Sequence, residues 1–237
     1  MDDSSMSRRR LLLGVGTGAA ALAGCLGGND GQGGDGTDGS EPTVTSGPTP
    51  TMTDGRLPAP VLGDPEASVT LAVYEDYACP HCADYNASGF DELASEFIDS
   101  GDIRYEHRDA PIPVADPGSW QAASAAREVQ ARHGNAAFWA YAKKLFENHR
   151  DLRGNVRSLF ERLVNDLGLD GAEAVATAGV DRAHDPTVRA DRQMAGQVGI
   201  QGTPAFVING QIVTSGFGSS TVDTVSSALD DALSESA

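Results

Sequence analysis

The stretch Ser68–Cys82, SVTLAVYEDYACPHC, decides the fold. Its first part, Ser68–Glu75, is apolar and β-branched enough to predict a buried strand. A short turn, Asp76-Tyr77-Ala78, follows. A helix is then expected from Pro80 to about Ser100, because proline suits the first helical position, where its missing N–H costs nothing. Two cysteines three residues apart therefore lie on one face at the start of a helix, directly after a buried strand.

Outward from this stretch, apolar patterns predict the remaining elements. They are a strand over Ile103–Arg108, a long run of helices within about 113–198, a hairpin of Ala205–Ile208 and Gln211–Thr214 around Asn209-Gly210, and a helix over Ser219–Leu233. Breaks between the helices are expected at glycines, the first of them at Gly134. The order strand, helix, strand, helical block, hairpin, helix predicts one α/β domain over about 57–237.

Cys79 and Cys82 have the positions of a redox pair. The N–H groups at a helix start carry a partial positive charge, and such sites lower a cysteine pKa into roughly the 3.5–7.5 range. A stabilised thiolate makes a Cys79–Cys82 disulfide easier to reduce, so the protein becomes an oxidant. Cys79 is expected to be the more exposed cysteine and the nucleophile, and Cys82 the buried resolving cysteine. Pro80 and His81 tune the pair, and His81 can direct a hydrogen bond or charge toward the Cys79 sulfur.

The same CxxC spacing is also half of a zinc site. Zinc usually needs four ligands, and the chain has three cysteines with no second pair. The histidines other than His81 have no ligand spacing. We therefore expect redox chemistry with no metal and no cofactor.

Cys79-Pro80-His81-Cys82, together with Gly202-Thr203-Pro204, resembles the DsbA family of the thioredoxin superfamily. The resemblance covers about residues 60–235 and implies a thioredoxin-like fold with a helical insertion at about 113–198. It also implies that Pro204 is cis and that Thr203 presents backbone groups to an extended substrate. The alternative is an ordinary trans-proline at a strand start. Thr203 departs from the valine common in the best-known DsbA proteins.

Further expectations concern four residues that precede Cys79, namely Val73, Glu75, Asp76 and Tyr77. Many thioredoxin-like proteins hold a buried carboxylate six residues before the first cysteine, where this chain has Val73. Asp76 is expected to cap the helix or its turn, and Glu75 as a proton relay is the alternative. Tyr77 is expected to line the peptide-binding groove.

The N-terminus predicts export. Ser7–Leu12, SRRRLL, carries a twin arginine, and the apolar stretch Leu11–Ala23 has 13 residues, too few to span a bilayer comfortably. Residues 1–24 resemble a twin-arginine signal peptide. Leu22–Cys25 resembles a lipoprotein cleavage box, with lipid on Cys25. A soluble protein cut nearby, with Cys25 as a free thiol, is the alternative.

Residues 25–56 are rich in Gly, Asp, Ser, Thr and Pro, and they predict a disordered, lipid-anchored linker. The expected location is the extracytoplasmic face of the cell membrane, with the lipid on Cys25 as the membrane contact.

The amino-acid composition limits the classes of partner that the protein can bind. The chain has 34 acidic and 17 basic residues, a net charge of −17, and only two lysines, Lys143 and Lys144. This balance excludes a nucleic-acid-binding surface. The Asp-rich, Lys-poor composition resembles that of proteins from halophilic archaea.

The favoured function is a dithiol oxidase that donates its disulfide to reduced exported proteins and is reoxidised by a membrane quinone-linked thiol oxidase. A reductase or isomerase that uses the same cysteines is the alternative. A copper metallochaperone is the alternative of another class.

Overall fold

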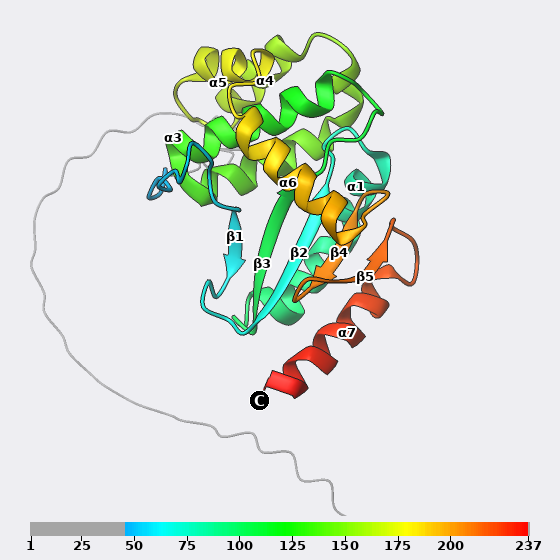
Figure 1. The fold of residues 1–237 in the computed structure, drawn as a ribbon. Helices are drawn as coiled ribbons and strands as arrows, with labels where there is room; N and C mark the ends of the chain where they lie inside the picture. The colour runs from blue at the N-terminus through cyan, green and yellow to red at the C-terminus, as the bar shows by residue number, and fades with distance from the viewer. Residues whose placement is uncertain (1–45, 237) are drawn as a thin grey trace, which may run out of the picture. The chain divides into compact units, whose positions relative to one another are not determined.

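A five-stranded sheet forms the centre of the domain in the computed structural model, which describes residues 46–236 (Figure 1). The strand order is β1-β3-β2-β4-β5. The strands are β1 (Val61–Gly63), β2 (Val69–Glu75), β3 (Ile103–Asp109), β4 (Ala205–Ile208) and β5 (Gln211–Ser215). Only β2 and β3 run parallel, and their register pairs Glu75 with Asp109. Two acidic residues therefore meet at the end of the sheet where the cysteine helix begins.

The strand β1 was not predicted. It has three residues and pairs with β3 at one edge of the sheet. So short a segment carries no alternation that could separate it from a loop.

The predicted cysteine helix is confirmed as a continuous helical run. It comprises α1 (Pro80–Asp84), the π-helical turn η1 (Tyr85–Gly89), α2 (Phe90–Leu93) and a second π-helical turn, η2 (Ala94–Ile98). Apolar side chains of this run pack on the sheet together with α7 (Thr221–Ser236) from the C-terminus.

The helical insertion is also confirmed, and in Figure 1 it lies over the C-terminal ends of β2 and β3. Its elements are α3 (Gly118–Glu147), the 3-10 turn η3 (His149–Arg153), α4 (Val156–Asp166), α5 (Ala172–Val180) and α6 (Asp185–Val198). The expected break in α3 is a kink at Gly134, whose φ of 81° leaves the helical region. A Cβ at this position would lie 2.4 Å from the carbonyl oxygen of Pro48, so only glycine fits.

Residues 46–56 contact the domain, so the predicted disordered linker is wrong for this part of its length. The N–H of Gly47 donates to the carbonyl oxygen of His133 at 2.8 Å. Ser46 Oγ lies 2.9 Å from His133 Nδ1. The composition of this segment does not indicate these contacts, because the partners are backbone groups and a histidine far along the chain.

The predicted signal peptide, Cys25 and the remainder of the linker lie outside the described residues. Within 46–236, no helix has the length and apolar character needed to span a bilayer.

Candidate active site

Cys79 begins the site because the chain changes there from the sheet to a helix. It is the N-cap residue of α1, with extended backbone angles (φ −79°, ψ 122°), and Pro80 follows in the first turn. Cys82 is completely buried and Cys79 is 3% exposed. Cys82 is thus confirmed as the buried cysteine, whereas Cys79 is scarcely more open. Both are free thiols, so the structure represents the dithiol form and the Cys79–Cys82 disulfide stays a prediction.

The two thiols differ strongly in acidity. A hydrogen bond from the Cys82 side chain, opposed by burial and aided by the Thr203 hydroxyl and the backbone N–H groups of Cys82 and His81, lowers the pKa of Cys79 from 9.0 to about 5. Burial raises the pKa of Cys82 well above its ordinary value, and its hydrogen bond to Cys79 adds to this. The helix start therefore holds one thiolate and one thiol at neutral pH.

Thr203 and Pro204 face Cys79 across the site. The Thr203–Pro204 peptide bond is cis, as expected. The thiol of Cys79 donates to the carbonyl oxygen of Thr203 at 3.5 Å. In this thiol form the buried Thr203 Oγ1 has no hydrogen-bond partner among the residues described, so it can donate to a thiolate instead.

The turn between β2 and α1 is held by Asp76, as predicted. Its carboxylate accepts from the N–H of Ala78 at 2.8 Å and from the N–H of Ile112 at 2.7 Å. Burial, opposed by these two hydrogen bonds, raises the pKa of Asp76 to about 6.

The expectation that Tyr77 lines a peptide groove is wrong. Tyr77 is 1% exposed, packs against the rings of His107 and Phe146, and its hydroxyl lies 3.2 Å from His107 Nε2. The hydroxyl of Tyr77 thus has a buried partner, His107, which is 30 residues away in the sequence and was not predicted.

A buried polar cluster lies beside Cys82 and was missed from the sequence except for Glu75. Glu75 Oε2 lies 3.3 Å from His107 Nδ1, and His107 Nε2 lies 3.2 Å from Asp109 Oδ1. Asn86 donates its side-chain N–H to Glu75 Oε1 at 2.7 Å and to the carbonyl oxygen of Cys82 at 2.9 Å. Each of Glu75, His107 and Asp109 is at most 2% exposed. The one available signal was the strand alternation, which places His107 and Asp109 on the same face as Ile103.

Burial and mutual contact set the charges of this cluster. Burial raises the pKa of Glu75, opposed by its hydrogen bond to His107. Burial lowers the pKa of His107, but hydrogen bonds to Asp109 and Glu75 outweigh it and raise the value to about 8. Burial raises the pKa of Asp109, but Arg127 and His107 outweigh it and lower the value to about 2.

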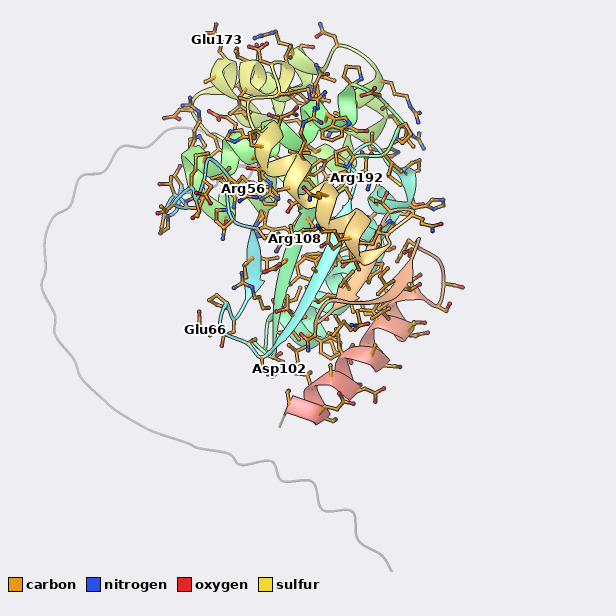
Figure 2. The ribbon with its side chains drawn as sticks, viewed as in Figure 1. Arg56, Glu66, Asp102, Arg108, Glu173 and Arg192 are labelled. Atoms are coloured by element: carbon orange, nitrogen blue, oxygen red, sulfur yellow. The ribbon has the colours of Figure 1, made fainter. Side chains whose placement is uncertain are left out.

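A chain of ion pairs continues from Asp109 into the helical insertion. Arg127 Nε of α3 lies 2.6 Å from Asp109, and Arg127 Nη2 lies 2.7 Å from Asp191 of α6. Asp191 also pairs with Arg108 at 3.0 Å, and Figure 2 shows Arg108 at the end of β3 beside α6. Arg127 is completely buried, so its charge depends on these two carboxylates.

His81 contributes to the site through its backbone rather than its ring. His81 is exposed, and its ring makes no hydrogen bond within the described part of the chain; only its backbone N–H acts on Cys79. Over residues 46–236, no three His, Cys, Asp or Glu side chains are arranged to hold a metal ion.

Comparison with known proteins agrees with this geometry. The chain is 28% identical over 158 residues to disulfide bond formation protein D of Bacillus subtilis, covering 65% of this chain and 69% of that protein. The structure is similar to oxidised BdbD from Bacillus subtilis, with a TM-score of 0.65, 25% identity, and coverage of 81% of this chain and 100% of that one. Chlamydia trachomatis DsbA shares the fold, with a TM-score of 0.63, 16% identity, and coverage of 79% and 99%.

The thioredoxin family itself matches residues 57–231. This range contains both cysteines, the Thr203–Pro204 bond and the helical insertion. The chain belongs to the thioredoxin family and has the fold of its DsbA-type thiol–disulfide oxidoreductases.

Proposed function

We propose that this protein is a dithiol oxidase that donates the Cys79–Cys82 disulfide to reduced exported proteins. The placement of Cys79 at the start of α1, within hydrogen-bond reach of Thr203, carries the proposal. These surroundings lower the pKa of Cys79 to about 5, so its sulfur is a stable thiolate at neutral pH. A thiolate that is stable in the dithiol form lowers the free energy of that form, and the disulfide becomes a stronger oxidant. The name of the Bacillus subtilis relative, disulfide bond formation protein D, agrees with this direction.

The proposed reaction has two exchanges. A substrate thiolate attacks the Cys79 sulfur, the Cys79–Cys82 bond breaks, and Cys82 leaves with the electron pair and takes up a proton. A second substrate thiolate then attacks the substrate sulfur of the mixed disulfide, and Cys79 leaves as its stabilised thiolate. The substrate loses two electrons and the cysteine pair gains them. A membrane quinone-linked thiol oxidase is the proposed acceptor that restores the disulfide.

Thr203 supplies the proposed contact for the substrate backbone. It precedes β4 and lies within hydrogen-bond reach of Cys79 through its carbonyl oxygen. An extended peptide beside Thr203 would gain main-chain hydrogen bonds that do not depend on its sequence. That suits an enzyme that acts on many unfolded chains.

The test compares the two directions of exchange. The wild-type disulfide form is expected to oxidise a reduced unfolded protein faster than the dithiol form reduces insulin. The equilibrium potential against glutathione is measured in parallel. Cys79→Ser is expected to abolish both activities, and Cys82→Ser to accumulate mixed disulfides on a non-reducing gel. A potential as low as that of thioredoxin, with fast insulin reduction, would support the reductase instead.

The location of this activity is also a proposal. The twin-arginine and Leu22–Cys25 motifs support export followed by attachment of lipid to Cys25, at the extracytoplasmic face of the cell membrane. Native protein is expected in the detergent phase after partitioning and Cys25→Ser in the aqueous phase, with equal exchange activity. Native protein in the aqueous phase would refute the anchor and leave the redox proposal intact.

A further inference from the structure

One segment of the helical insertion, residues 143–162, is basic in an otherwise acidic protein. Six of the chain's 17 basic residues lie in this basic segment, together with only three of its 34 acidic residues. The remainder of the chain has 11 basic and 31 acidic residues, so the basic segment differs in sign from its surroundings. It covers the end of α3, the turn η3 and most of α4.

A shallow hollow of about 660 Å³ lies on the basic segment. Three arginines line it, Arg150, Arg153 and Arg162, and all three are exposed. The one acid in its lining, Asp151, lies 3.8 Å from Arg162. Asp151 therefore offsets the charge of Arg162, and the charges of the other two arginines give the hollow its positive sign.

Arg150 and Arg153 have no carboxylate partner within residues 46–236, although most arginines of the domain have one. Nine of the twelve arginines in that range have a carboxylate oxygen within 4.0 Å. An arginine forms strong, charge-assisted hydrogen bonds with carboxylates. In a domain rich in carboxylates, these two guanidinium groups are therefore available to the carboxylates of another molecule.

The hollow lies on the part of the insertion that packs over the cysteine helix. Leu152, between the two unpaired arginines, is 2% exposed and belongs to the same buried cluster as both active-site cysteines. A groove of about 390 Å³ is lined by Ala83, the residue after Cys82. His149, the residue before Arg150, also lines it. The groove therefore extends from the cysteine helix toward the hollow.

The occupant of this surface has to carry negative charge and be narrow. A bilayer with anionic headgroups is broad, so it would also face the acidic surface around the basic segment and be repelled by it. An extended polypeptide can contact the groove and the hollow alone. A substrate protein also has to lie beside the cysteine helix, where the groove begins.

We propose that the hollow binds acidic segments of substrate proteins, whose carboxylates contact Arg150 and Arg153 while a cysteine of the same chain reaches Cys79. Unfolded chains with runs of Asp or Glu near a cysteine are then oxidised in preference to neutral chains. The rest of the acidic surface repels such chains, so the basic segment directs them to the cysteine helix. This inference names the substrate class of the proposed function and rests on it.

The test uses the full-length disulfide form and two unfolded peptides that differ only in charge. Each peptide has two cysteines, flanked on both sides by glutamates in one peptide and by glutamines in the other. The measured quantity is the ratio of their second-order rate constants of oxidation, glutamate peptide over glutamine peptide. In Arg150→Gln/Arg153→Gln this ratio is expected to fall about tenfold from the wild-type value, because two contacts between exposed charges are lost. Glutamates also change the acidity of the peptide thiols, but this effect cancels when the ratio is compared between two proteins.

Arg56→Gln/Arg132→Gln is the matched control, because it removes the same charge from two exposed arginines outside the basic segment. It is expected to keep the wild-type ratio. An equal fall in both double variants would show that only net charge matters, and would overturn the inference. An unchanged ratio in the Arg150→Gln/Arg153→Gln protein would also overturn it. Failure of the wild type to oxidise either peptide would instead overturn the proposed function.

Two measurements on the wild type cover the case in which the double variant fails to fold. Molar salt is expected to lower the ratio, because it screens contacts between exposed charges, and an unchanged ratio would contradict the proposal. Vesicles of phosphatidylglycerol are expected to leave the ratio unchanged in dilute buffer. A fall with these vesicles, and none with neutral phosphatidylcholine vesicles, would show that the hollow binds a membrane and would overturn its assignment to substrate proteins.

Discussion

Replacing Thr203 by valine is expected to make the protein a weaker oxidant. Valine keeps the shape and β-branching of threonine and removes only the hydroxyl. In the structure this hydroxyl is buried and has no partner within the described residues while Cys79 is a thiol, yet it is in reach of the Cys79 thiolate. The substitution therefore removes one hydrogen bond from the thiolate form of Cys79. In the thiol and disulfide forms it removes a buried hydroxyl that has no partner. Both effects favour the disulfide.

The magnitude follows from one hydrogen bond to a charged group. Such a bond contributes about 1.5 kcal/mol, which corresponds to about one pKa unit. The pKa of Cys79 is therefore expected to rise from about 5 to about 6, because one unit is lost with the bond. The reduction potential is expected to fall by about 30 mV, since this shift corresponds to about 1.4 kcal/mol for two electrons.

The assay is thiolate absorbance against pH, with the potential measured against glutathione. Thr214→Val is the matched control, because Thr214 lies on β5 opposite Phe206 and is not among the groups that act on the Cys79 thiol. It is expected to change neither quantity. A Thr203→Val protein with a Cys79 pKa still near the wild-type value would refute the role of the hydroxyl.

Three further predictions concern stability, each measured by urea denaturation. Arg127→Met is expected to lower the free energy of unfolding by about 3–5 kcal/mol, because it leaves Asp109 and Asp191 buried without their cation. The control Arg132→Met, at an exposed arginine, should lower it by less than about 1 kcal/mol. Equal losses in the two variants would contradict the argument. Because the pKa of Asp76 is raised on folding, protonated Asp76 stabilises the fold at low pH, and this stabilisation is lost as pH rises from about 4 to about 6. The free energy of unfolding of the wild type should therefore fall by up to about 3 kcal/mol more than that of Asp76→Asn over this range. Parallel pH profiles would show that Asp76 does not titrate there. The net charge of −17 predicts a higher denaturation midpoint in molar salt than in dilute buffer, and an unchanged midpoint would exclude charge repulsion as a main destabilising effect.

The order of elements could be predicted because each has its own local pattern. The run Val69–Glu75 alternates little and is mainly apolar, as a central strand with covered faces should be, and Pro80 marks the start of α1. The strand Ala205–Ile208 was predicted with its observed bounds. The edge strand Val61–Gly63 could not be, because its only structural determinant is pairing with β3.

The candidate site divides in the same way. Cys79, Cys82 and Thr203-Pro204 carry local motifs, so sequence alone could propose them. His107, Asp109 and Arg127 carry none, since each acquires its role from partners far along the chain: 32 residues separate His107 from Glu75, and 64 separate Arg127 from Asp191. Tyr77 shows the opposite error, because closeness to the motif in sequence suggested a surface role for a side chain that is buried.

The pairing of Arg127 with Asp109 and Asp191 limits how the domain can be redesigned. A plan to shorten the chain to a minimal thioredoxin by excising residues 118–198 would remove Arg127 and Asp191 together. At the end of β3, the buried Asp109 side chain would keep only its contact with His107, and Arg108 only its ion pair with Glu106. The insertion is therefore no detachable module, and a truncated version is expected to need an apolar replacement at Asp109, which would lose its cation in a buried place.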